Sequence, residues 1–172
     1  VLATGDTDAA RVAQACAAPP ASGQRLFYQK HMTHHMVAGL PRDWFGAVRH
    51  MFLIRHPARV LASYVVKREA PTLEDIGFVQ QTEIFEAVQT TAPPVVLDTT
   101  DLRANPETML RALCAALEIP FDPGMLSWPK GGHAADGIWA AHWYDAVHRS
   151  TGFAGPEGPL PQVPAALGPL LE

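Results

Sequence analysis

The sequence predicts an α/β fold in which a parallel sheet is flanked by helices. Residues 52–54 form an apolar run that ends at Arg55, and Pro57 follows where a helix would begin. Residues 95–98 form a second short apolar run, and the next helix start lies at Asn105. Because strands that alternate with helices pair in parallel, we expect three layers, with helices on both faces of the sheet.

The first third of the chain is expected to contain one helix and one strand before the arginine-ended strand. The helix pattern runs from Asp8 to Ala17 and stops before two prolines. A strand is expected over residues 25–29 and one or two helical turns over residues 33–38. The arginine-ended strand itself lies within residues 47–55.

The remaining elements are predicted from caps, prolines and helical spacing. A helix is expected over residues 57–68. A long helix should run from Thr72 to Gln89, because Thr72 is followed three residues later by an acid. The helix after Asn105 ends before Pro120. Its predicted buried stripe consists of Met109, Leu110, Leu113, Cys114 and Leu117. Residues 120–137 are expected to be mostly loop, and Trp139 to His148 a last helix.

Length and composition indicate one domain. The chain has 172 residues, is 48% hydrophobic and carries a net charge of −4. We place the α/β domain at residues 1–154 and a tail rich in Pro and Gly at residues 155–172. The net charge argues against broad nucleic-acid binding, and no apolar run approaches the length needed to cross a bilayer. Two cysteines without metal or redox spacing favour a reduced, cytoplasmic setting.

The strand that ends at Arg55 has the character of a phosphate site. Open α/β sheets bind ligands at the carboxyl ends of their strands, and a guanidinium can grip a phosphate with two hydrogen bonds. The N–H groups of the following first helical turn would add a partial positive field. Arg59, Ser63 and Lys67 are spaced by four and share one helix face. The alternative is that Arg55 forms an ion pair and that Arg59 and Lys67 are solvated surface.

Three segments resemble P-loop sulfotransferases, which use 3′-phosphoadenosine 5′-phosphosulfate (PAPS). Arg55-x-Pro57-x5-Ser63 resembles their 3′-phosphate-binding segment. The strand 95–98, followed by Asp101-Leu102-x-x-Asn105-Pro106, is similar to a second family segment. Tyr28-Gln29-Lys30-His31-Met32 looks like the Lys-x-His segment that precedes the arginine-ended strand. The resemblance covers about residues 26–119, and the runs 136–144 and 150–153 are similar to the C-terminal part of bacterial sulfotransferase-like proteins.

The resemblance implies a partial P-loop NTPase-like sulfotransferase fold and a 3′-phosphoadenosine nucleotide (PAPS or PAP) as co-substrate. Arg55, Ser63 and Arg59 would hold the 3′-phosphate. Lys30 would stabilise the negative charge that develops on the leaving phosphate. Lys130-Gly131 is a looser match to a late Lys-Gly segment that closes over the nucleotide, and a flexible turn is its alternative.

The resemblance also implies a histidine base for the acceptor. In the family pattern the histidine lies two residues after the lysine, where this chain has Met32. His31 is our first candidate, followed by His34 or His35. The three histidines would lie near one helix face, but no carboxylate or cysteine is close in sequence, so we expect no metal site.

A departure from the family concerns the phosphate loop. Residues 1–25 contain no Gly-rich loop with the lysine or arginine that such a loop carries. We therefore expect the N-terminal strand and phosphate loop to be missing from this chain.

Three functions follow as hypotheses. The first is direct in-line transfer of a sulfuryl group from PAPS to a hydroxyl or amine of a small-molecule acceptor, with no required metal. The second is a non-catalytic domain that binds a nucleotide or a partner. The third is a histidine phosphatase, because Arg55-His56 ends a strand; in that class, however, the pair is followed by glycine, and here Pro57 follows.

Overall fold

The computed structural model describes residues 5–66, 70–90, 93–134, 136–138 and 140–171. Its contacts divide the chain into two compact units. The first consists of Leu2–Val96 with Pro159–Glu172, and the second of Leu97–Gly158. The division falls inside strand β2 (Val95–Asp98), so each unit is described by itself.

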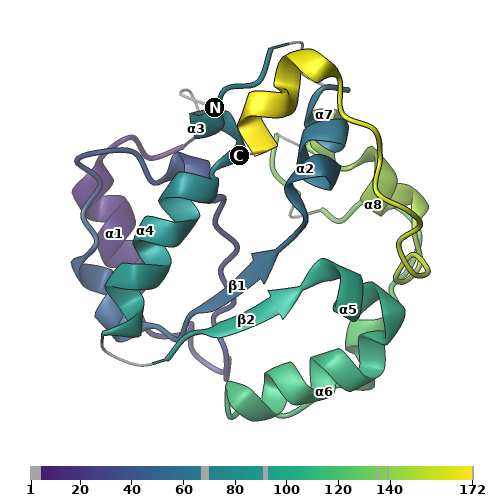
Figure 1. Ribbon diagram of the computed structural model, residues 1–172. Coiled ribbons are helices and arrows are strands. Elements are labelled where there is room, and N and C mark those ends of the chain that lie inside the picture. Colours follow the sequence, from purple (N-terminus) through teal and green to yellow (C-terminus); the bar gives the residue numbers. More distant parts are fainter. Residues whose placement is uncertain (1–4, 67–69, 91–92, 135, 139, 172) are drawn as a thin grey trace. The chain divides into compact units, whose positions relative to one another are not determined.

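The sheet has two strands in the described part of the chain, β1 (Met51–Ile54) and β2. Their arrows point the same way in Figure 1, which confirms the predicted α/β class with parallel pairing. The His50 carbonyl accepts a hydrogen bond from the Val95 N–H at 3.2 Å where the pairing begins.

The predicted strand at residues 25–29 is wrong. The segment has no strand pairing, and Leu26, Phe27 and Tyr28 are 54%, 46% and 72% exposed. A strand is stable only where a neighbouring strand takes up its backbone hydrogen bonds and its apolar side chains find a face to cover. This apolar segment has neither within the described residues.

The first unit surrounds β1 with helices. They are α1 (Ala9–Ala17), η1 (Thr33–His35), η2 (Asp43–Ala47), α2 (Pro57–Tyr64), α3 (Leu73–Ile76), α4 (Phe78–Gln89) and η4 (Ala165–Leu171). The predicted helix from Asp8 is confirmed: the Asp8 carboxylate accepts hydrogen bonds from the Ala10 and Arg11 N–H groups at 3.0 and 3.1 Å. Helix α2 begins at Pro57 as predicted, and η1 supplies the helical turn expected after Met32.

The long helix expected over residues 72–89 is interrupted at Gly77. Thr72 and Asp75 form the predicted capping box, but Gly77 has φ +71° and separates α3 from α4. A β-carbon at position 77 would lie 2.7 Å from Thr33 Oγ1, whose hydroxyl donates to the Gly77 carbonyl at 2.8 Å. The break therefore arises from a long-range contact as well as from glycine's access to left-handed backbone.

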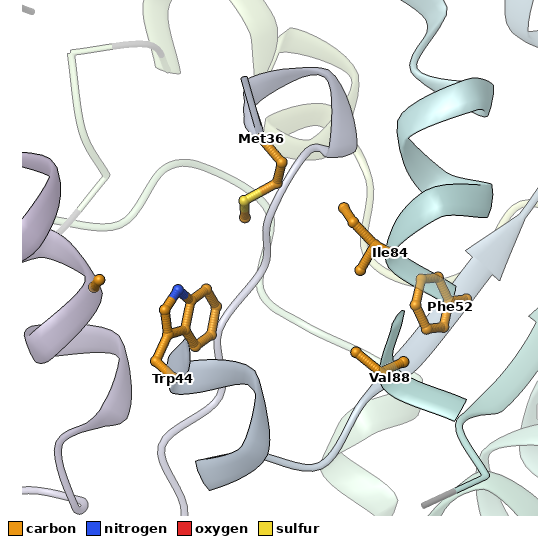
Figure 2. Packing of buried hydrophobic residues seen from close by; sticks show 6 residues of the cluster. Met36, Trp44, Phe52, Ile84 and Val88 are labelled. Atoms are coloured by element: carbon orange, nitrogen blue, oxygen red, sulfur yellow. The ribbon is translucent and has the colours of Figure 1, made fainter. Parts of the chain in front are cut away.

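The apolar core of this unit joins α1, η2, β1 and α4 with Met36, the residue that caps the end of η1. Figure 2 shows Met36, Trp44, Phe52, Ile84 and Val88 pointing toward a shared interior from η1, η2, β1 and α4. Each is 9% exposed or less. Burying such side chains contributes about 1.5–3 kcal/mol apiece, so this cluster fixes the position of β1 and of the residue that ends it.

The second unit is mostly helical. Its elements are α5 (Thr99–Ala104), α6 (Pro106–Ala116), η3 (Pro123–Leu126), α7 (Ala140–Trp143) and α8 (Asp145–Arg149). Helix α6 starts at Pro106 and buries Leu110 and Cys114, as its stripe predicted. The last predicted helix is divided into α7 and α8, and Trp139 lies outside the described residues. None of the helices described has the length and apolar character that a membrane span requires.

Candidate functional site

Arg55 stands where β1 ends and the chain turns into α2. Its side chain is partly exposed, while Phe52 on the strand is 7% exposed and anchored in the core. Helix α2 buries Ala58 and Leu61 at 5% and 0% exposure. Packing on both sides thus holds the strand-to-helix corner in which Arg55 lies.

The first turn of α2 is closed by His56. The Ala58 N–H donates to His56 Nδ1 at 3.2 Å, and the Arg59 N–H donates to the His56 carbonyl at 2.9 Å. The N–H groups of Ala58 and Arg59 are therefore bonded within the turn. An anion here would meet the side chain of Arg55 and the weak positive field of the helix end rather than these two N–H donors.

Arg59 and Ser63 lie one helical turn apart on α2, as the sequence predicts. Ser63 is exposed and Arg59 partly exposed, on the side away from the buried Leu61. The third member of the predicted face, Lys67, lies outside the described residues. The structure thus places Arg55, Arg59 and Ser63 on one short, continuous segment, whose other side buries Ala58 and Leu61.

Lys30 and His31 belong to the same unit but lie in an extended segment without regular structure. Lys30 is exposed. The His31 ring packs on Trp44 with 5.4 Å between centroids, and its Nε2 lies 3.1 Å from Gln29 Oε1. Gln29 was not expected from the sequence as a site residue, because an amide between two strand-like residues carries no readable signal.

Gln29 determines which nitrogen of His31 is basic. The Gln29 Nε2 donates to the Cys16 carbonyl at 2.7 Å, which orients the amide so that its Oε1 faces the ring as an acceptor. His31 Nε2 must then carry the proton, and in the neutral ring the lone pair lies on Nδ1.

The surroundings of His31 keep it neutral. Burial lowers the pKa of His31, and the positive charges that His35 and His50 carry when protonated lower it further. A neutral imidazole near pH 7 is the form that can accept a proton.

His34 and His35 lie in η1 with their rings 4.3 Å apart in an edge-on arrangement. No group of three or more metal-ligating side chains is present among the described residues. The expectation of no metal remains a prediction for the whole chain.

Lys130 and Gly131 lie in the second unit, in a turn that pairs with residues 148–153. The Gly131 N–H donates to the His148 carbonyl at 2.8 Å, and Gly131 has φ +116°. The Trp128 N–H donates to the Thr151 carbonyl at 3.1 Å, which extends the pairing. Lys130 is exposed. Backbone hydrogen bonds therefore hold this turn.

Asp136 and His148 form a hydrogen-bonded pair beside this turn that the sequence did not reveal. Asp136 Oδ2 lies 2.9 Å from His148 Nε2 and accepts the His133 N–H at 2.8 Å. These bonds, first that from His133 and then that from His148, lower the pKa of Asp136. No sequence signal joins residues twelve apart across an irregular loop, so only the structure could bring them together.

A shallow hollow of about 210 Å³ lies on the sheet of the first unit. Its lining is mostly apolar and consists of Phe52, Ile54, Gln81, Thr82, Phe85 and Val96. Gln81 Nε2 donates to the Leu53 carbonyl at 3.2 Å. Ile54 is the residue before Arg55, so an apolar surface adjoins the arginine-ended corner.

Comparison with known proteins identifies a family and two relatives. The sulfotransferase domain family matches residues 1–167. Two curated proteins of Arabidopsis thaliana are also similar, branched-chain-amino-acid aminotransferase-like proteins 1 and 2. They are 39% and 36% identical over 138 and 129 residues, which is 79% and 74% of this chain.

The chain spans about a quarter of the length of these relatives, 25% and 23%. No solved structure matches it. The family match covers nearly the whole sequence, including the segments around Lys30, Arg55 and Lys130. This chain belongs to the sulfotransferase domain family.

Proposed function

We propose that this chain binds a 3′-phosphoadenosine nucleotide and transfers a sulfuryl group from PAPS to a hydroxyl or amine of a small-molecule acceptor. The observation that carries the proposal is the β1–α2 corner. In a member of the sulfotransferase family, an arginine ends a core strand and is followed at once by a helix bearing Arg59 and Ser63. The proposal includes a partial form of that family's three-layer P-loop NTPase-like fold, without the N-terminal strand and phosphate loop.

Each residue then has a chemical role. Arg55 binds the 3′-phosphate with its guanidinium, and Arg59 and Ser63 add a second charge and a hydroxyl. Lys30 lies near the bridging oxygen and stabilises the charge that develops there as the sulfur–oxygen bond breaks. Lys130 and Gly131 would bind a phosphate of the nucleotide, as the resemblance to the family implies.

The acceptor step balances without a covalent enzyme intermediate. The acceptor oxygen or nitrogen attacks sulfur while the bond from sulfur to the phosphate oxygen breaks, and PAP leaves with that electron pair. The acceptor's proton passes to His31 Nδ1, the nitrogen that Gln29 leaves unprotonated. His56 is accounted for by its capping of α2, so it needs no role as a phosphorylated nucleophile.

The test is calorimetric titration of PAP and of ADP into the chain. We expect PAP to bind more tightly than ADP, because only PAP has the 3′-phosphate. Arg55→Ala should weaken PAP binding by roughly 10- to 100-fold, since charge-assisted hydrogen bonds are lost, and leave ADP binding nearly unchanged.

Arg25→Ala is the matched control, because Arg25 is an exposed arginine of the same unit. Equal affinities for PAP and ADP, or equal effects of the two arginine variants, would contradict the proposed site. Binding without turnover of PAPS across a panel of phenols, alcohols and amines would favour the non-catalytic alternative.

A further inference from the structure

The turn that carries Lys130 is tied to helix α8 through a single histidine. The His148 carbonyl accepts the Gly131 N–H at 2.8 Å, and the His148 ring binds Asp136 Oδ2 at 2.9 Å. Asp136 Oδ2 also accepts the N–H of His133 at 2.8 Å. His148 therefore restrains the chain on both sides of Gly132, directly at Gly131 and through Asp136 at His133.

The chemistry of these contacts fixes the ring. Asp136 Oδ2 can only accept when ionised, so His148 Nε2 is the donor. The carboxylate oxygen thus receives a ring N–H and a backbone N–H together. Such charge-assisted bonds are stronger than neutral ones and have narrower geometry.

The space around the pair is matched to glycine. A β-carbon on Gly132 would lie 3.2 Å from His148 Cε1 and 3.3 Å from Asp136 Oδ2. Gly131 adopts φ +116°, where other residues are strained. Two successive glycines therefore let the turn lie directly against the Asp136–His148 pair.

The residues that hold the turn are less exposed than the lysine that the turn carries. The side chains of His148 and Asp136 are 30% and 26% exposed, whereas Lys130 is exposed to solvent. The Tyr144 ring lies 6.0 Å from the His148 ring, on the same short helical region. A supported turn presents its lysine with less conformational entropy left to lose when an anion binds.

We propose that the Asp136–His148 pair is a positioning device that holds the Lys130–Gly132 turn in the conformation that contacts a nucleotide phosphate. The proposal rests on the proposed function, in which Lys130 and Gly131 bind a nucleotide phosphate. Asp136 and His148 act through the turn and do not touch the ligand. Their loss should therefore weaken phosphate binding only as far as Lys130 and the turn contribute to it.

The first test needs no ligand. Amide hydrogen exchange at Gly131 and His133 is followed by NMR in the parent chain and in His148→Ala. We expect exchange to become roughly tenfold faster at His133, whose acceptor Asp136 loses the ring that orients it, and to change less at Gly131, whose acceptor is a backbone carbonyl that alanine retains. Asp145→Asn is the control, because this carboxylate on the same helix lies 3.7 Å from Arg149 and is exposed. Unchanged exchange in His148→Ala would overturn the proposal.

The second test is calorimetric titration of PAP in a double-mutant cycle. His148→Ala should weaken PAP binding roughly three- to tenfold, and His148→Gln, whose amide N–H can donate to Asp136, should retain most of the affinity. In a Lys130→Ala chain, His148→Ala should cause no further loss, because it acts through that lysine. Additive losses would overturn the proposal in favour of a general structural effect.

The two tests separate failure of this inference from failure of the proposed function. A parent chain that binds no PAP overturns the proposed function and the positioning role with it. A parent that binds PAP, with an affinity insensitive to His148→Ala, overturns the positioning role alone.

Discussion

The two segments expected to contact phosphate are held in place by different forces. The β1–α2 corner behind Arg55 rests on apolar side chains, with Phe52, Ala58 and Leu61 at 7%, 5% and 0% exposure. The segment 127–153, which carries Lys130, has no buried side chain among its described residues. It is held instead by backbone pairing and by polar side chains such as Trp128, whose Nε1 donates to Ser150 Oγ at 2.9 Å.

The difference predicts two kinds of failure. Apolar burial is cumulative and insensitive to pH, so the corner should keep its geometry until the unit unfolds. A hydrogen bond between partly exposed groups contributes only about 1 kcal/mol net, and each can be lost separately. The Lys130 segment should therefore change locally, under conditions that leave the Arg55 corner intact.

The largest effect is expected in the apolar region. Leu61→Ala removes a fully buried side chain from the inner face of α2. It should lower the free energy of unfolding by about 2–5 kcal/mol, measured by urea denaturation. Val66→Ala is the control, since Val66 is 78% exposed and should change stability by less than about 0.5 kcal/mol. Similar losses in both variants would show that α2 does not rest on Leu61.

A smaller effect is expected in the polar region. Ser150→Ala removes the acceptor of the Trp128 indole N–H and the donor to the Val147 carbonyl. We expect a loss of about 1 kcal/mol in urea denaturation, because water can replace part of each bond at these partly exposed positions. Thr151→Ala, an exposed neighbour whose carbonyl alone is used in the pairing, should be near neutral. A loss as large as that of Leu61→Ala would remove the contrast between the two segments.

The smallest effect is a pH dependence confined to the segment 127–153. Because the folded state lowers the pKa of Asp136 below its usual 3.8, its contribution is complete above the pKa of the unfolded chain. That contribution is lost as the pH falls through the lowered value. In the acid range below about pH 5, the NMR shift of the His133 amide proton should stay constant until the pH falls below about pH 4 and should move only there.

Asp136→Asn provides the reference for this titration. Its His133 amide should show no transition in the acid range. A midpoint above 3.8 in the parent chain would mean that Asp136 is not stabilised in its ionised form.

Local rules were sufficient for the Arg55 corner. Apolar residues 52–54, the proline at the first helical position and the spacing of Arg59 and Ser63 are all short-range signals, and the structure contains the strand and helix they predict. The same holds for the capped start of α1 and for α6. Each depends on neighbours within one or two turns.

Long-range contacts account for what the sequence could not provide. Residues 25–29 have strand-like composition, but a strand also needs a partner, which no local pattern supplies. The role of Gln29 depends on the Cys16 carbonyl, thirteen residues away. The Asp136–His148 pair depends on the path of an irregular loop. In both cases the decisive atom is contributed by a distant segment.

The helix break at Gly77 also affects the segment that contains the histidines. η1 packs against both α3 and α4, and Thr33 at its start bonds to the carbonyl at the break. The Gly77 carbonyl accepts both the Thr33 hydroxyl at 2.8 Å and the Gln81 N–H at 2.9 Å, so the residue at the break starts the backbone bonding of α4 and holds η1 as well. The left-handed residue Gly77 thus holds the first residue of η1. The positions of the candidate bases His34 and His35, which follow in η1, therefore depend on the break between α3 and α4.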